Sequence, residues 1–130
     1  MSDFSIERRM YYHNTDSGGV VYYGNYFLLL EEGRVEFLLN KGVSTAEYAS
    51  EGIVFPVVCV DIKYKSPARY GDVVKIFTRV EKIGNTSMHF VQEIKRDEKL
   101  LVEAKTVWAC VGPDFQTITV PDKIRKAINP

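Results

Sequence analysis

Apolar and polar residues alternate at the start of the chain. Phe4, Ile6 and Met10 are separated by polar residues at positions 5, 7 and 9, and Arg8 is the exception on the apolar side. A period of two is typical of a β-strand, because successive side chains point to opposite faces. We therefore predict a strand that runs to about residue 12. The segment at 14–19 then ends the pattern, since all its residues favour turns or caps.

A helical period follows over residues 22–40. Its apolar face has the i, i+3, i+4, i+7 spacing and consists of Tyr26, Leu29, Leu30, Gly33 and Phe37. The charged residues that fall mostly on other sides are Glu31, Glu32, Arg34 and Glu36. Their i, i+3 spacing favours ion pairs or interface contacts on the helix surface.

The ends of this helix also carry sequence signals. Asn25 is a candidate cap at the start, and Lys41-Gly42 supplies a cation and a glycine where the helix should stop. Gly33 is unfavourable in a helix interior, so we expect a close packing partner against it. A capping box that begins at Ser44 predicts a second, short helix to about Ser50.

Four apolar-rich runs follow, at about 53–65, 72–83, 87–96 and 100–111, and each is interpreted as a strand. Gly84-Asn85 has the composition of a hairpin turn in which Gly adopts a positive φ. A short amphipathic helix is expected from Pro121 onward. Strands in this sequential order pair antiparallel, and a single long helix buries its apolar face against them. The pattern predicts one α+β domain over residues 1–130, with one long helix wrapped by an antiparallel sheet of about five strands.

Several strands carry apolar residues on both faces, as in the neighbouring pairs Val57-Val58 and Val73-Val74. One helix covers only one face of a sheet, so the other face needs a second sheet or subunit. Pairing of edge strands between two copies also removes an exposed edge. We therefore expect a homo-oligomer, at least a dimer.

Charge and composition argue against several classes of function. The chain has 130 residues with 17 Lys+Arg against 17 Asp+Glu, so its formal net charge is +0. General nucleic-acid binding requires a basic face, which this balance does not favour. No apolar run approaches the roughly 20 residues of a membrane span. Two cysteines in a chain without a signal peptide predict a cytoplasmic protein with reduced thiols.

The motifs of other catalytic classes are missing from the sequence. The two histidines, His13 and His89, and the two cysteines, Cys59 and Cys110, are dispersed and lack the spacing of metal ligands. There is no Gly-x-Ser-x-Gly elbow of a serine hydrolase and no dinucleotide-binding glycine pattern. We therefore expect no metal site.

The segment from Asp16 to the start of the long helix is the part that can carry chemistry. A helix N-terminus offers unpaired N–H groups that stabilise a developing oxyanion. A carboxylate nearby can attack a carbonyl carbon or activate a water molecule. Gly18-Gly19 lets the backbone approach a ligand closely. From composition alone, a turn or capping role for Asp16 is favoured over catalysis.

The run Thr15-Asp16-Ser17-Gly18-Gly19-Val20-Val21-Tyr22, followed by Tyr26, resembles the signature of the hotdog-fold acyl-CoA thioesterases. The similarity is to the 4-hydroxybenzoyl-CoA thioesterase family, and most closely to its YbgC-type branch. Residues 31–36 are similar to the family's Glu-x-Ala-Arg-x-Glu helix, and residues 66–69 to its Pro-Ala-Arg turn. The strand and helix order read from periodicity is also the hotdog order.

The resemblance implies hydrolysis of an acyl-CoA thioester without a metal or redox cofactor, coenzyme A being part of the substrate. Asp16 is then the catalytic carboxylate, either as a nucleophile that forms an anhydride or as a general base on water. The backbone N–H of Tyr23 is the implied oxyanion contact, with Gly24 as its neighbour. The candidate substrate-binding residues are Gly18, Gly19, Val21, Tyr26, Arg69 and Lys82. The candidates for the phosphates of coenzyme A are Lys63, Lys65, Arg69 and Lys82, of which Arg69 lies in the matched turn. The family also implies active sites at a dimer interface and a dimer of dimers.

Two positions depart from the family pattern. Asn14 stands where the family commonly has Asp, so a negative charge near Asp16 is missing, which is not interpreted as loss of activity. Tyr23 stands where the YbgC-type branch usually has His, so any assistance from that side chain is absent. Two other functions stay open, namely a non-catalytic acyl-CoA or acyl-carrier binding module and a hotdog dehydratase.

Overall fold

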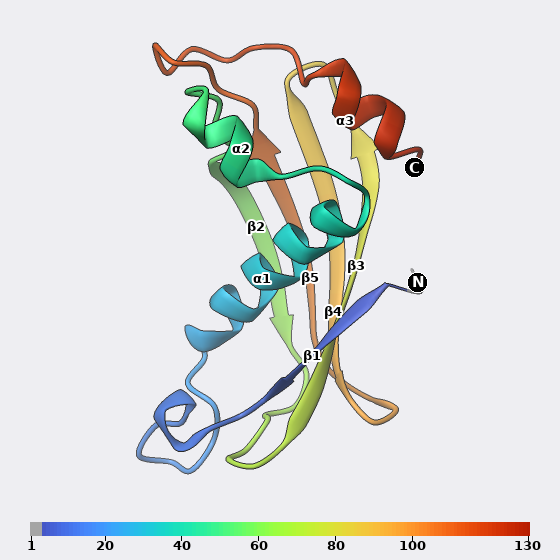
Figure 1. Ribbon diagram of the computed structural model, residues 1–130. Coiled ribbons are helices and arrows are strands. Elements are labelled where there is room, and N and C mark those ends of the chain that lie inside the picture. Colours follow the sequence, from blue (N-terminus) through green and yellow to red (C-terminus); the bar gives the residue numbers. More distant parts are fainter. Residues whose placement is uncertain (1–3) are drawn as a thin grey trace.

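The computed structural model describes residues 4–130 and contains a five-stranded sheet in the order β1-β3-β4-β5-β2 (Figure 1). Its strands are β1 (Ser5–Arg9), β2 (Val57–Tyr64), β3 (Val73–Ile83), β4 (Ser87–Arg96) and β5 (Lys99–Ala109). The helices are α1 (Asn25–Asn40), α2 (Thr45–Ser50) and α3 (Asp122–Ala127), and a 3-10 helix, η1, spans Tyr12–Asn14. Every strand pair is antiparallel, which confirms the predicted α+β architecture.

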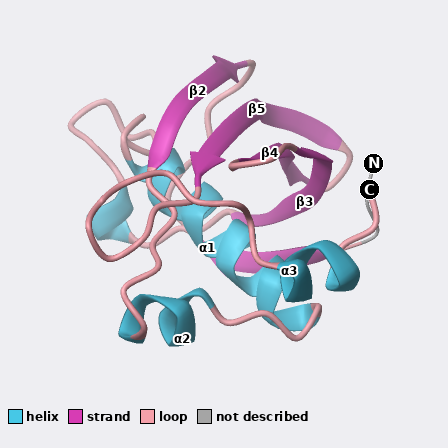
Figure 2. Ribbon diagram, turned by 90° about the horizontal axis from the view of Figure 1, so that it is seen from above, coloured by secondary structure: helices cyan, strands magenta, loops and turns pink. Residues whose placement is uncertain are grey.

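The long helix α1 lies along the inner side of the curved sheet (Figure 2). Its buried residues are Tyr26, Leu29, Leu30, Gly33, Arg34, Phe37 and Leu38. The five residues that the helical period assigns to the apolar face are all in this set, so the predicted face is confirmed. The short helices at Thr45–Ser50 and Asp122–Ala127 also agree with the sequence-based expectation.

Gly33 is the point at which α1 approaches the sheet most tightly. A Cβ atom added there would lie 2.7 Å from Ile76 Cγ2 and 2.9 Å from both Gln92 Nε2 and Thr78 Oγ1. Only a residue without a side chain lets the helix axis come this near to β3 and β4. The expected close packing partner is therefore the inner face of these two strands.

The expected position of Arg34 on an outer side of the helix is wrong, because its side chain is only 5% exposed. Its guanidinium donates hydrogen bonds to Gln92 Oε1 at 3.1 Å and to Thr106 Oγ1 at 3.5 Å, and lies over the Trp108 ring. Burial lowers the pKa of Arg34 to about 10. Among residues 4–130, no carboxylate forms an ion pair with it. Because α1 approaches the sheet so closely at Gly33, the side chain of the next residue, Arg34, lies between the helix and the sheet.

Two element boundaries and one turn differ from the sequence-based expectation. β1 ends at Arg9, since the chain then turns into η1. Gly24 occupies the cap position of α1, whereas Asn25 is the first helical residue. The β3–β4 connection closes through a hydrogen bond from Gly84 N–H to Ser87 O at 2.8 Å. The φ of Gly84 is not positive, so the expected primed turn is not formed.

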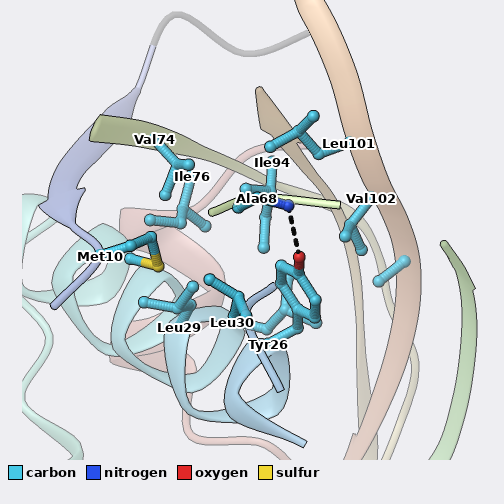
Figure 3. Close-up of a cluster of buried hydrophobic side chains, with 12 residues drawn as sticks. Met10, Tyr26, Leu29, Leu30, Ala68, Val74, Ile76, Ile94, Leu101 and Val102 are labelled. Atoms are coloured by element: carbon cyan, nitrogen blue, oxygen red, sulfur yellow. Dashed lines mark hydrogen bonds between the residues drawn. The ribbon is translucent and has the colours of Figure 1, made fainter. Parts of the chain in front are cut away.

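Two hydrophobic clusters hold α1 against the sheet. The first surrounds the N-terminal half of the helix, where Tyr26 and Leu30 pack with Met10, Ile76 and Ile94 (Figure 3). The second lies beyond Gly33 and contains Phe37, Phe90, Trp108, Val120 and Ile124. Because both ends of the helix are packed, its first turn has a fixed place relative to the strands.

Strand β2 leaves an exposed apolar edge. Its Val57, Val58 and Val60 are exposed, and so are Phe27 and Leu28 on α1. A cavity of about 250 Å³ is lined by Val57 and Val60 from β2 and by Phe27 and Leu28 from α1, with Arg34 and Thr106 among the other lining residues. The helix thus covers one face of the sheet only, as expected, while the oligomer that this implies stays a prediction. No helix in residues 4–130 is long and apolar enough to cross a membrane.

Candidate active site

Asp16 lies in a tight loop between η1 and α1. The loop is closed by a bridge between Thr15 and Val21 and by a hydrogen bond from Asp16 N–H to Val20 O at 2.9 Å. The carboxylate Oδ1 accepts a hydrogen bond of 2.8 Å from Gly18 N–H. The next residue, Gly19, has a φ of +79°, a backbone conformation that glycine adopts without strain. The carboxylate is exposed to solvent, and one of its oxygens is held by this main-chain donor.

Two main-chain N–H groups at the start of α1 are unpaired. Tyr22 N–H donates to Asn14 O at 2.9 Å, and Asn25 N–H donates to Tyr22 O at 2.9 Å. Between them, the N–H groups of Tyr23 and Gly24 have no acceptor in the described part of the chain. Adjacent unpaired donors at a helix N-terminus are suited to stabilising an oxyanion.

Asn14 connects the Asp16 loop to α1. Its Oδ1 accepts a hydrogen bond from Tyr11 N–H at 2.7 Å, and its Nδ2 donates to Asn25 Oδ1 at 3.1 Å. The Nδ2 group of Asn25 is buried and has no partner among residues 4–130, so after a flip of its amide Asn25 has a donor for an Asp at position 14 as well. These contacts tie the loop to α1 but do not explain the departure from the family pattern.

The turn that follows β2 holds the same loop from another side. Ala68 O accepts a hydrogen bond from Val21 N–H at 2.8 Å, and Ala68 N–H donates to the Tyr26 hydroxyl at 3.0 Å. The turn is itself closed by a hydrogen bond from Arg69 N–H to Asp72 Oδ2 at 2.9 Å. The Pro-Ala-Arg turn thus contacts both the loop and the helix.

A cleft of about 240 Å³ opens beside the start of α1. It is lined by Val21, Tyr23, Tyr26, Tyr64, Lys65, Ser66 and Pro67. The ring of Tyr64 lies with its centroid 5.6 Å from that of Tyr26 and 6.4 Å from that of Tyr23. The cleft is lined mostly by aromatic and apolar side chains, and Tyr23, which carries one of the unpaired N–H groups, is among its lining residues.

The structure brings most of the sequence-predicted residues together. Asp16, Gly18 and Gly19 form the loop, Tyr23 and Gly24 carry the unpaired N–H groups, and Val21 and Tyr26 line the cleft. Arg69 is exposed beside the loop, through its bridge to Val20. Lys82 lies near the C-terminal end of β3. The other end of β3 begins at Val73, which pairs with β1 close to the loop. Within one chain Lys82 is therefore remote from Asp16.

Tyr64 is a cleft residue that the sequence pattern did not single out, whereas Ser66 belongs to the 66–69 turn that resembles the family motif. Tyr64 is the last residue of β2. The signal available for Tyr64 was its position close before that turn. Its approach to α1 depends on the pairing of β2 with β5, which a local pattern does not show.

The other titratable groups considered from the sequence lie outside this arrangement. The His13 ring stacks on Tyr11, and His89 Nε2 is 3.2 Å from Ser87 Oγ. Cys59 is exposed and Cys110 is buried, and both are free. Residues 4–130 contain no group of three or more His, Cys, Asp or Glu side chains placed to hold a metal ion. The available chemistry is a carboxylate, a pair of N–H donors and a cleft.

Comparison with known proteins shows which family and which relatives this chain is similar to. The sequence profile described as Thioesterase superfamily matches residues 18–103. The acyl-CoA thioester hydrolase YbgC of Escherichia coli O6:H1 is 37% identical over 106 residues, which cover 81% of this chain and 79% of that protein.

Solved structures agree with the profile. A hypothetical protein, TT1821, from Thermus thermophilus superimposes with a TM-score of 0.91 at 30% identity, over 95% of each chain. Slr0204, a 1,4-dihydroxy-2-naphthoyl-CoA thioesterase from Synechocystis, gives a TM-score of 0.89 at 26% identity, over 96% of this chain and 94% of that one. The chain has the hotdog fold and belongs to the thioesterase superfamily.

Proposed function

We propose that the chain hydrolyses the thioester of an acyl-CoA to a free acid and coenzyme A, with Asp16 as the catalytic carboxylate. The observation that carries this proposal is the pair of unpaired N–H groups of Tyr23 and Gly24 beside a cleft, with an oriented carboxylate in the adjoining loop. The name of the Escherichia coli relative, an acyl-CoA thioester hydrolase, supports the same reaction.

In this proposal the acyl group occupies the cleft and its carbonyl oxygen accepts hydrogen bonds from Tyr23 and Gly24. These donors stabilise the negative charge that develops on the oxygen during attack. Their positions are set by the packing of α1, so little reorganisation accompanies the reaction. The thiolate of coenzyme A is a good leaving group and needs no general acid at the point of C–S cleavage.

Two roles of Asp16 are compatible with its geometry. As a general base it takes a proton from a water molecule, whose oxygen attacks the carbonyl carbon before the C–S bond breaks. As a nucleophile, its carboxylate oxygen forms a mixed anhydride as the thiolate leaves, and water then hydrolyses the anhydride and restores Asp16. In both cases the products are one carboxylic acid and one thiol.

Arg69 is our candidate for contacting the coenzyme A phosphates, because it is exposed next to the Asp16 loop. Its backbone is held by Asp72, which fixes the place from which the guanidinium extends. A role for Lys82 requires a second subunit, since within one chain this residue lies far along β3. The proposed reaction uses no metal or other cofactor.

The proposal includes a homo-oligomer, with a dimer of dimers as its expected form, and a cytoplasmic location. The exposed apolar edge formed by β2 and the adjoining side of α1 supports the assembly, since a second copy covers such a surface and pairs the free strand edge. The two free cysteines support a reducing compartment.

Release of free thiol from a panel of short, long and aromatic acyl-CoAs tests the function. We expect turnover of at least one member of the panel by the wild-type protein and loss of that turnover in Asp16→Asn. Binding of acyl-CoA without any thiol release would contradict the proposal and would favour a non-catalytic binding module.

A further inference from the structure

We propose that Tyr26 is a positioning residue whose hydroxyl fixes the distance between the Asp16 loop and the oxyanion donors of α1. This inference rests on the proposed function of the same site. Tyr26 lies in the first turn of α1, two and three residues after the donors Gly24 and Tyr23. It therefore connects the part of the helix that carries the donors to another segment of the chain.

The hydroxyl of Tyr26 has a defined main-chain partner. The residue is 3% exposed, and its ring packs in the first hydrophobic cluster (Figure 3). The hydroxyl oxygen accepts a hydrogen bond of 3.0 Å from Ala68 N–H, which Figure 3 shows as a dashed line. Burial raises the pKa of Tyr26, so the group is a neutral phenol over the physiological range.

Two further hydrogen bonds connect Ala68 to the Asp16 loop. Ala68 O accepts from Val21 N–H at 2.8 Å, and Val20 O accepts from Asp16 N–H at 2.9 Å. Val20 and Arg69 also form a bridge, so the loop and the turn run side by side. Tyr26 thus reaches Asp16 through main-chain groups without contacting the carboxylate.

The far side of the turn is anchored to the sheet independently of Tyr26. Asp72 Oδ2 accepts hydrogen bonds from Arg69 N–H at 2.9 Å and from Arg96 Nη1 at 2.8 Å. Arg96 Nη1 also lies 3.3 Å from Pro67 O. Removal of the Tyr26 hydroxyl should therefore leave the turn folded and change only its distance from α1.

The positioning role is separable from packing because Phe fills the same space in the cluster. Tyr26→Phe removes one oxygen, leaves Ala68 N–H without its acceptor and keeps the ring. Small displacements of reacting groups reduce turnover strongly, while substrate binding depends on them less. We expect kcat to fall by about 10- to 100-fold, with KM within about 2-fold of wild type.

Ile94→Val is the matched control. Ile94 is fully buried in the same cluster, and its aliphatic side chain has no group that could hydrogen-bond to the 66–69 turn. Both substitutions are expected to lower Tm by roughly 2–8 °C. Only Tyr26→Phe should lower kcat. An equal loss of kcat in both variants, or a kcat within 2-fold of wild type in Tyr26→Phe, overturns the proposal.

Amide hydrogen exchange supplies a readout that does not depend on hydrolysis. Tyr26→Phe should accelerate exchange at the N–H groups of Asp16 and Val21, whereas Ile94→Val should leave both near the wild-type rate. Faster exchange in a protein that hydrolyses no acyl-CoA supports the structural link and contradicts the proposed function. Unchanged exchange at both amides overturns the link, whatever the activity.

Discussion

The Oδ1 atom of Asp16 accepts a hydrogen bond of 2.8 Å from the main-chain N–H of Gly18. This bond holds one oxygen of the carboxylate, while Oδ2 has no partner in residues 4–130. A carboxylate with one oxygen held and the other free is oriented for attack or for proton transfer. The same bond also closes the loop, so its proposed catalytic role and its structural role have to be separated by the choice of variant.

Gly18→Ala tests the orientation of the carboxylate. A Cβ atom at residue 18 would lie 3.2 Å from Asp16 Oδ1, which is closer than ordinary van der Waals contact. The φ of Gly18 is not positive, so Ala is tolerated by the backbone. We expect kcat to fall by about 10-fold with little change in Tm. Ser17→Ala, in the same exposed loop, is the control; an equal effect there would contradict the explanation.

The Gln92 side chain is expected to be essential for the contact between α1 and the sheet. It is fully buried, donates to Leu30 O and Thr78 Oγ1 at 2.9 Å each, and accepts from Arg34 at 3.1 Å. Gln92→Ala leaves a buried guanidinium without its main acceptor and should lower the free energy of unfolding by about 2–4 kcal/mol.

Urea denaturation measures this effect, and Glu93→Ala provides its control. Glu93 is the next residue of β4, and the one polar contact of its side chain within residues 4–130 is a long ion pair of 3.9 Å with Lys95. Its replacement should change the free energy of unfolding by less than about 1 kcal/mol. A Gln92→Ala variant as stable as wild type would show that the buried polar contacts contribute no net stability.

The exposed edge at β2 predicts the assembly state. Light scattering of the wild type should give at least a dimer at micromolar concentration. Val58→Lys places a charge on a strand residue that is 61% exposed in the single chain, and it should shift the protein toward a monomer of 14.9 kDa. Phe115→Lys, on the loop after β5, should not change the mass. A monomeric, fully active wild type would contradict the expectation.

A chelator is expected to leave activity unchanged, because the proposed reaction uses only Asp16 and main-chain donors. Thiol release is compared before and after dialysis against EDTA. A strong loss of activity that one specific divalent ion restores would show that the proposed chemistry is incomplete.

Periodicity predicted the elements because it records which side of a helix or strand is buried. The α1 face and the strands at 73–83 and 87–96 follow directly from it. Arg34 did not, because a charged residue next to Gly33 is drawn inward by close helix–sheet contact. Lys82 falls near the end of the strand predicted at 72–83, but only the pairing of β3 with β1 shows that this end is remote from Asp16.

The residues of the site also fall into those that a local motif identifies and those that only the fold brings together. Asp16, Gly18 and the helix start are close in sequence, so a local motif identifies them. Tyr64 and the contact between Tyr26 and Ala68 join segments that are far apart in the chain. These contacts require the pairing of β2 with β5 and the packing of α1, which no local pattern encodes.

Turnover of the best acyl-CoA substrate by Asp16→Asn tests the central claim most directly. Asn is nearly isosteric with Asp, and its Oδ1 can still accept the hydrogen bond from Gly18 N–H, so the loop should keep its form. The neutral amide neither attacks a carbonyl carbon nor accepts a proton from water. We predict unchanged Tm, unchanged assembly and retained acyl-CoA binding, with turnover reduced by about 10²–10⁴-fold for a general base and by more for a nucleophile. Turnover within a few-fold of wild type, with a lowered Tm, would show that Asp16 is a turn residue and would contradict the account.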